Sequence, residues 1–283
     1  MSLFLKTTYL YLREDEKEMK KLIALLLALV MVMSVAACDK KENTPAVPAT
    51  NNDKNEVTPE APQVDFTKSE GVMTYAEYDA AKVDDPVTVE TFVQDKQSWW
   101  DNKAIIYTQD NEGAYFVYEM ACSEEDYAKL VKGQKIRIKG FKADFQGEKE
   151  IADGTFEILD GNYIAPATDV TNILGTEDIV KYQNRFVEFK GMTVAPSTDA
   201  DGNEVAFLYK WNGSGQDGDD LYFNVELNGN TYSFTVESYL RDKDSDVYKA
   251  VKNLKVGDKI DMTGYLYWYD TVNPHIISVS NVK

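Results

Sequence analysis

One phrase occurs twice in this 283-residue chain, and it limits the possible folds more than any other part of the sequence. Residues 130–140 read LVKGQKIRIKG, and residues 254–264 read LKVGDKIDMTG. In each copy a leucine precedes a glycine of the kind that ends helices, and apolar residues then alternate with polar ones as in a half-buried strand. The phrase therefore predicts the end of a helix followed by a strand, in two units of similar structure.

A helix is expected immediately before each phrase. The first, SEEDYAKLV, begins with Ser123 and has Asp126 three positions later, which is a capping-box arrangement, and Ser245 begins the second helix. Three strand-like runs precede each helix, and the last two runs of the second unit are joined by NGN, a strong hairpin signal. In chain order, the runs are residues 87–93, 104–110 and 114–120, then 186–194, 221–227 and 231–236.

Two further strand-like runs follow the helix in each unit, so the order is three strands, a helix and two strands. This order resembles the OB-fold, a five-stranded barrel. We therefore predict a mainly β protein with two small five-stranded OB-fold-like barrels, each with a helix between strands three and four. The expected domains are residues 71–165 and 166–283.

The amino-terminal part predicts export and anchoring. Residues 19–38 contain two lysines, an unbroken apolar run and small residues before Cys38, which is typical of a bacterial export signal. The apolar run is shorter than the roughly 20 residues that a membrane-spanning helix needs. The sequence VAAC resembles the lipobox of bacterial lipoproteins, which implies cleavage before Cys38 and lipidation of that cysteine. Met19 is the expected start, because the residues before it are acidic where such a signal should be basic.

Residues 1–37 are accordingly assigned to an upstream extension and a signal peptide. Residues 38–70 are rich in Pro, Asn and Thr and show no apolar periodicity, so we expect a disordered tether. The chain also resembles lipoproteins of gut Gram-positive bacteria that carry two such barrels, on residues 75–90, 96–118 and 121–140. That resemblance implies a membrane-anchored protein facing the outside of the cytoplasmic membrane, with no established activity.

The net charge of −18 argues against nucleic-acid partners, because phosphate backbones are bound through Lys and Arg. The best basic stripe alternates with apolar residues and faces nearby acids, so we interpret it as a solvated strand face and expect no nucleic-acid partner. Its members are Lys132, Lys135, Arg137, Lys139 and Lys142.

Few residues suit catalysis or metal binding. Histidine occurs only at His275, and Cys122 is the one cysteine besides Cys38. One histidine and one cysteine are too few ligands for a structural zinc site. We expect Cys122 to be a small apolar residue at a strand-to-helix corner and His275 to contact solvent on the last strand. No cofactor is expected.

A long polar loop, residues 195–220, separates the first two strands of the second unit. Within it, Asp199, Asp201 and Asn203 alternate as at the start of a calcium loop, but Lys210 stands where the bidentate Glu should be. We interpret the segment as a flexible acidic hairpin and keep calcium as a weak alternative.

Aromatic residues are the remaining candidates for ligand contact. Trp99 and Trp100 lie in the loop between the first two strands, which OB-folds use for ligands. The sequence YLYWYD places Tyr267 and Tyr269 on one face of an extended chain and Trp268 on the other. For this stretch we expect packing between the barrels, with ligand stacking as the alternative. Trp99 and Trp100 point to opposite faces, so at most one ring is expected inside the barrel and the other is a candidate for ligand contact.

These patterns favour a non-catalytic, membrane-anchored binding or adaptor module for a glycan, peptide or protein partner. The alternative is a cell-envelope hydrolase, or an enzyme accessory subunit, that uses carboxylates between the barrels. Single-stranded nucleic-acid binding ranks below both.

Overall fold

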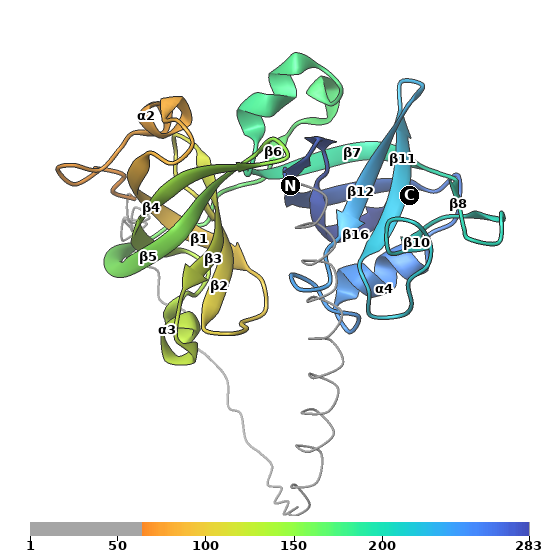
Figure 1. The fold of residues 1–283 in the computed structure, drawn as a ribbon. Helices are drawn as coiled ribbons and strands as arrows, with labels where there is room; N and C mark the ends of the chain where they lie inside the picture. Colours follow the sequence, from red (N-terminus) through yellow and green to blue (C-terminus); the bar gives the residue numbers. More distant parts are fainter. Residues whose placement is uncertain (1–63, 283) are drawn as a thin grey trace, which may run out of the picture. The chain divides into compact units, whose positions relative to one another are not determined.

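The computed structural model describes residues 64–282 (Figure 1). The predicted signal peptide, Cys38 and most of the predicted tether lie outside the described residues. Within residues 64–282, no helix has the length and apolarity needed to cross a membrane.

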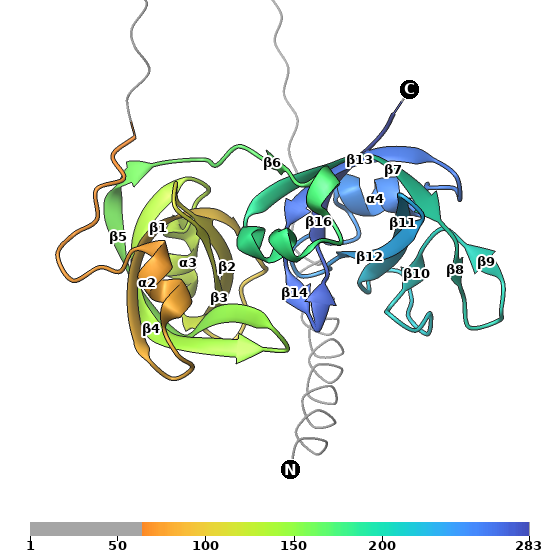
Figure 2. The same ribbon diagram turned by 90° about the horizontal axis from the view of Figure 1, so that it is seen from above.

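Five strands close into the first barrel in the order β1-β2-β3-β5-β4 (Figure 2). They are β1 (Pro86–Lys96), β2 (Lys103–Gln109), β3 (Ala114–Ala121), β4 (Gln134–Phe145) and β5 (Glu148–Asn162). Helix α2 (Tyr75–Ala80) precedes the barrel, and helix α3 (Glu124–Lys129) lies between β3 and β4. Inward residues such as Val89, Ile106 and Ile138 form the core of this barrel, because they alternate with outward residues along each strand.

The second barrel repeats this plan. Its strands are β7 (Phe186–Ala195), β11 (Leu221–Leu227), β12 (Asn230–Val236), β13 (Lys259–Tyr265) and β16 (His275–Asn281). They are hydrogen-bonded in the order β11-β12-β16-β13-β7, and the pairing of β11 with β7 closes the ring. Helix α4 (Asp246–Lys252) lies between β12 and β13. The predicted fold class, two five-stranded OB-fold-like barrels, is confirmed.

Short elements decorate the second barrel. They are β6 (Thr168–Asp169), η1 (Thr171–Ile173) and η2 (Glu177–Tyr182) before β7, β8 (Ser197–Thr198), β9 (Glu204–Val205) and β10 (Leu208–Tyr209) in the inserted loop, and β14 (Trp268–Tyr269) and β15 (Thr271–Val272) before β16. Strand β10 pairs with β11 and so widens the barrel sheet by one short strand.

The repeated phrase has the same geometry in both barrels. Leu130 and Leu254 are buried, each in the core of its own barrel. Gly133 and Gly257 then adopt φ angles of 90° and 91°, a left-handed conformation that costs a glycine little. The phrase therefore occurs twice because each barrel needs the same turn from its helix into its fourth strand.

The described chain begins within the segment assigned to the tether. The ring of Phe66 makes edge contacts with Phe92 and Tyr163, at centroid distances of 5.8 and 4.9 Å. The end of the segment predicted to be a disordered tether therefore packs on the first barrel at Phe66, and Lys68 pairs with Asp110 at 2.7 Å. The domain boundary at residue 71 stays a prediction.

Candidate functional site

The outer face of β2 and β3 in the first barrel packs against the second barrel. The rings of Tyr107 and Tyr265 are stacked, with centroids 4.4 Å apart and an interplanar angle of 15°. The hydroxyl of Tyr107 lies 2.8 Å from Nδ1 of His275. Tyr107 and Phe116 are 0% and 3% exposed, so a ligand has no access to this face of the first barrel.

Polar contacts surround these rings. The guanidinium of Arg241 donates to both carboxylate oxygens of Asp95. The side-chain oxygen of Gln109 accepts the backbone N–H of Phe186 at 2.8 Å. These contacts tie β1 and β2 of the first barrel to the second barrel.

Glu148, the first residue of β5, lies in another part of the contact between the two barrels. Its Oε2 accepts the backbone N–H of Trp268 at 2.9 Å and the side-chain amide of Gln183 at 3.2 Å. Burial raises the pKa of Glu148 to about 8, and hydrogen bonds from Asn184 and Gln183 oppose that rise. Because the side chain is fully buried, its carboxyl has no direct access to a substrate in solvent.

The equivalent face of the second barrel, formed by β11 and β12, is open except at Thr235, which is buried. Strand β11 alternates buried residues with half-buried Tyr222 and Asn224 and exposed Glu226. Thr231 and Ser233 of β12 lie opposite Glu226 and Asn224, and both are exposed. This face therefore presents an aromatic ring, an amide, a carboxylate and hydroxyl groups side by side.

Trp211 is not among the residues predicted from the sequence, yet it is the most exposed large apolar side chain in residues 64–282, at 66%. It follows β10, which is hydrogen-bonded to Leu221 and Tyr222 of β11. A signal exists in the sequence, because a tryptophan in a polar, glycine-rich loop has no core position to fill.

The predicted pair Trp99 and Trp100 is half-buried, and neither ring belongs to a barrel core. The indole Nε1 of Trp99 donates to the backbone carbonyl of Cys122 at 2.9 Å. The ammonium of Lys103 lies 5.0 Å from the ring centroid of Trp100. Cys122 itself is buried directly before Ser123, the N-cap of α3, as predicted for a corner residue.

Tyr267 and Trp268 lie near the contact between the barrels. Tyr267 packs edge-on against Phe116 at 5.4 Å, and Trp268 packs against the core of the second barrel. Tyr269 is partly exposed, with its ring centroid 5.9 Å from that of Phe145. The structure thus brings these three residues to the first barrel or to the second core, and places Trp99 and Trp100 apart from both cores.

The prediction that His275 contacts solvent is wrong. The residue is 7% exposed, because its ring stacks on Tyr267 at 4.2 Å and its Nδ1 faces the hydroxyl of Tyr107. Its strand lies beside β12 and next to the first barrel, and the sequence of one strand does not reveal such a neighbour.

The calcium candidates form a tight turn between β8 and β9. The carboxylate of Asp199 accepts the backbone N–H groups of Asp201 and Asn203 at 3.0 and 2.8 Å, and these hydrogen bonds lower its pKa. In the part of the chain that the structure describes, no group of three or more His, Cys, Asp or Glu side chains could hold a metal ion.

In the basic stripe, Lys135, Arg137 and Lys142 are paired or buried, whereas Lys132 and Lys139 are exposed. The guanidinium of Arg137 donates to Glu90 at 2.8 and 3.0 Å and to Glu157 at 2.9 Å. The ammonium of Lys142 is buried 3.5 Å from the ring centroid of Tyr78, and burial lowers its pKa to about 8. The stripe is therefore only partly the solvated face that we expected.

The fold defines a protein class, tandem OB-fold-like barrels. No protein-family model and no curated protein matches the chain. Among solved structures, it is similar to a replication protein A heterotrimer bound to single-stranded DNA, with 18% identity over 29% of this chain and 62% of that chain and a TM-score of 0.24. It is also similar to the Ifi202 HINa domain in complex with 20-bp double-stranded DNA, with 10% identity over 71% of this chain and 97% of that chain and a TM-score of 0.32.

A murine DNA-binding protein bound with double-stranded DNA is a further similar structure, with 10% identity over 70% of this chain and 99% of that chain and a TM-score of 0.31. These structures overturn our exclusion of nucleic-acid partners. That exclusion used the net charge of the whole chain, whereas binding depends on how charge is distributed over the contacting surface. Nucleic acid therefore belongs among the ligand classes to be tested.

Proposed function

We propose that this chain is a non-catalytic binding module whose ligand surface is the outer face of β11 and β12, and that its ligand is a neutral glycan. The observation that carries the proposal is the difference between the barrels. OB-folds bind oligosaccharides and oligonucleotides on the face of strands two and three and on the adjoining loops. That face is covered in the first barrel and open in the second.

The chemistry of the open face favours sugars. An exposed indole such as Trp211 can stack on the apolar side of a pyranose ring, and Tyr222 adds a second aromatic surface. Asn224 and Ser233 supply amide and hydroxyl groups that can hydrogen-bond sugar hydroxyls, and Glu226 supplies a carboxylate acceptor. Such a face binds by shape and hydrogen bonding and needs no reactive group.

A ligand panel tests the proposal. The full chain is titrated with neutral oligosaccharides of glucan, galactan and chitin type, with a single-stranded oligonucleotide and with peptides. Trp211→Ala should weaken glycan binding by about 1–3 kcal/mol, the value of a stacking contact, and should change stability by less than about 1 kcal/mol. Phe141→Ala is the matched control, because Phe141 is an exposed aromatic residue on β4 of the first barrel.

Three other outcomes would change the proposed ligand, the proposed activity or the proposed location of the site. Oligonucleotide or peptide binding that is lost in Trp211→Ala would replace the glycan as the ligand of this face. Shortened oligosaccharides would support the hydrolase alternative. Glycan binding that survives both Trp211→Ala and Asn224→Ala would show that the ligand surface lies elsewhere.

We also propose that a lipid on Cys38 holds the chain at the outer side of the cytoplasmic membrane. The support is the sequence of residues 19–38, with its basic start, apolar run and lipobox-like end. Membrane fractionation of Cys38→Ala tests it. The variant should leave the membrane fraction, and retention there would contradict the anchor.

A further inference from the structure

The helices between the third and fourth strands differ in one respect. In the second barrel, α4 buries Val247, Tyr248 and Val251 in the core. In the first barrel, α3 buries none of its six residues. Only the half-buried Tyr127 of α3 packs against the core of the first barrel, and Ile158 on the neighbouring strand β5 stays exposed.

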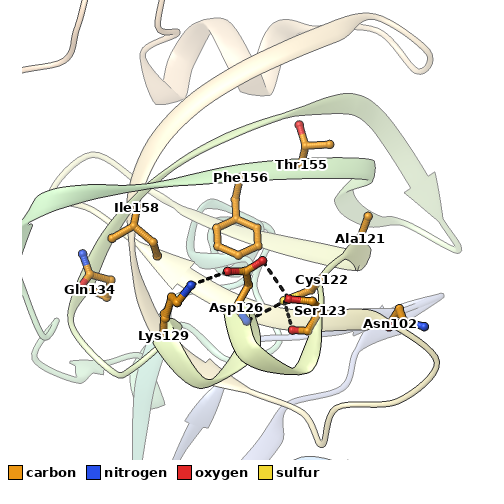
Figure 3. A pocket seen from close by; sticks show the side chains of 10 residues that line it. All are labelled: Asn102, Ala121, Cys122, Ser123, Asp126, Lys129, Gln134, Thr155, Phe156 and Ile158. Atoms are coloured by element: carbon orange, nitrogen blue, oxygen red, sulfur yellow. Dashed lines mark hydrogen bonds and ion pairs between the residues drawn. The ribbon is translucent and has the colours of Figure 1, made fainter.

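An open groove of about 960 Å³ lies beside α3 (Figure 3). Thr155, Phe156 and Ile158 of β5 form one side, and Cys122, Ser123, Asp126 and Lys129 form the side at α3. Ile158 pairs with Ile136, which is fully buried, yet Ile158 itself is 39% exposed in the groove. Phe156 and Ile158 thus give the groove an apolar floor, at strand positions that face the interior of the barrel.

The same groove borders an unpaired strand edge. Strand β5 pairs with β3 only at Glu150 and Ile151, whereas its pairing with β4 extends to Asn162. From Thr155 onward, β5 is therefore paired on one side only within the described residues. Such an edge is a template for an added strand, which gains main-chain hydrogen bonds along its whole length.

The charge beside the groove is acidic. The first turn of α3 carries Glu124, Glu125 and Asp126. The only cation of this helix, Lys129, is already paired with Glu125 at 3.2 Å and Asp126 at 2.8 Å. The ammonium of Lys96 also reaches α3, where it donates to the backbone carbonyl of Tyr127 at 2.6 Å. One negative charge therefore remains in excess, and it favours a cationic partner.

We propose that the groove between α3 and β5 binds an extended basic peptide segment of a partner protein as an added strand on β5. Apolar side chains of the peptide rest on Phe156 and Ile158, and its Lys or Arg side chains meet the acidic turn of α3. At about 3.3 Å per residue, the edge from Thr155 to Ile158 accommodates a core of about four residues, with flanking residues reaching α3. This site is separate from the open face of the second barrel.

The first experiment compares charge. Fluorescein-labelled peptides of alternating Lys and Val, and of alternating Glu and Val, are titrated into the full chain, and binding is followed by fluorescence anisotropy. We expect the Lys peptide to bind at least tenfold more tightly and to weaken as salt rises. Equal affinity for the Glu peptide would overturn the charge argument, and with it the proposal.

The second experiment tests strand addition. N-methylation of every other residue removes the N–H donors on one edge of the peptide and leaves its side chains unchanged. A strand pairs through one edge, so one of the two alternately methylated Lys peptides should lose binding and the other should keep it. Equal affinities of both for the full chain would show that the peptide does not pair with β5.

The third experiment locates the site. Ile158→Lys places a like charge on the groove floor and should weaken binding at least tenfold. Ile164→Lys is the matched control, because Ile164 is exposed just after β5 and does not line the groove. If the two variants bind the peptide equally well, net charge alone attracts it and the groove is not the site. Melting curves show whether Ile158→Lys and Ile164→Lys are folded. Trp211→Ala, which changes the open face of the second barrel, should leave peptide binding unchanged.

Discussion

Gly140 and Gly264, the last residues of the repeated phrase, each lie at an irregular point of strand pairing. A Cβ at Gly140 would lie 2.7 Å from the carbonyl oxygen of Ala152, and one at Gly264 would lie 2.3 Å from that of His275. Both positions coincide with register shifts against the last strand of their barrel. Glycine is required there because a neighbouring backbone passes too close for a side chain.

We therefore expect Gly264→Ala to lower the free energy of unfolding by about 2–3 kcal/mol, because a backbone carbonyl cannot rotate away from the added methyl group. Gly154→Ala should cost less, because its Cβ would meet the flexible side chain of Met120 at 3.3 Å. Urea unfolding of both variants measures the difference. Equal losses would contradict the role assigned to the close backbone approach.

Glu148 should make stability depend on pH. Burial raises its pKa from 4.5 to about 8, and its Oε1 has no hydrogen-bond partner within the described residues. Between these two values the folded state holds a proton that the unfolded state has released, so stability should fall as pH rises from about 4.5 to 8. Glu150, whose pKa burial raises to about 7, acts in the same direction.

Glu148→Gln should remove much of this pH dependence. Between pH 4.5 and pH 8, the slope of the free energy of unfolding should decrease by up to about 1.4 kcal/mol per pH unit. Urea unfolding at pH 5, 6.5 and 8 measures it, with the exposed Glu226→Gln as control. A wild-type chain that gains stability from pH 5 to pH 8 relative to Glu148→Gln would contradict the assigned direction.

Helices α3 and α4 should differ in dynamics. Because α3 buries no side chain and α4 buries three, local opening should cost less free energy in α3. We expect the amides of α3 to exchange with solvent at least tenfold faster than those of α4 in hydrogen-exchange mass spectrometry. Equal protection would mean that contacts other than core burial hold α3.

Most elements follow from local sequence. Ser123 caps α3 by accepting the N–H of Asp126 at 3.1 Å, and Ser245 caps α4, as the capping pattern predicts. The last strand of the first barrel, β5, runs without a break from Glu148 to Asn162. Asp153, with a φ of 51°, and Gly154 interrupt the alternation there, and sequence periodicity cannot separate such a bulge from a loop.

The contact between the barrels is the least predictable feature of this protein. Tyr107 and Phe116 lie on strands that are apolar on both faces. This pattern indicates that the outer face of the strands is covered, but it does not identify the element that covers it. The partner surface around Tyr265 and His275 is distant in sequence, and no local pattern pairs it with β2. For the same reason, the open face of the second barrel could not be assigned before the contact was known.

The contact should couple the stabilities of the barrels. Tyr107→Ala and Tyr265→Ala should each cost about 3–5 kcal/mol, as for truncated core aromatics. The double variant should cost less than the sum by about 0.5–1.5 kcal/mol, the value of an aromatic pair. Thermal unfolding measures this cycle, and strict additivity would show that the rings do not interact in solution.

The same contact decides how the molecule would respond to force. If the proposed lipid anchor and the proposed ligand surface are both in use, the chain is pulled at both ends. Tension then reaches the second barrel through residues 163–185 and through the stacked rings of Tyr107 and Tyr265. Sliding Tyr107 off Tyr265 and parting Arg241 from Asp95 breaks a few contacts, whereas opening a closed barrel breaks a whole ladder of hydrogen bonds. The contact between the barrels would therefore break before either barrel unfolds. The molecule would become longer while the ligand stays bound.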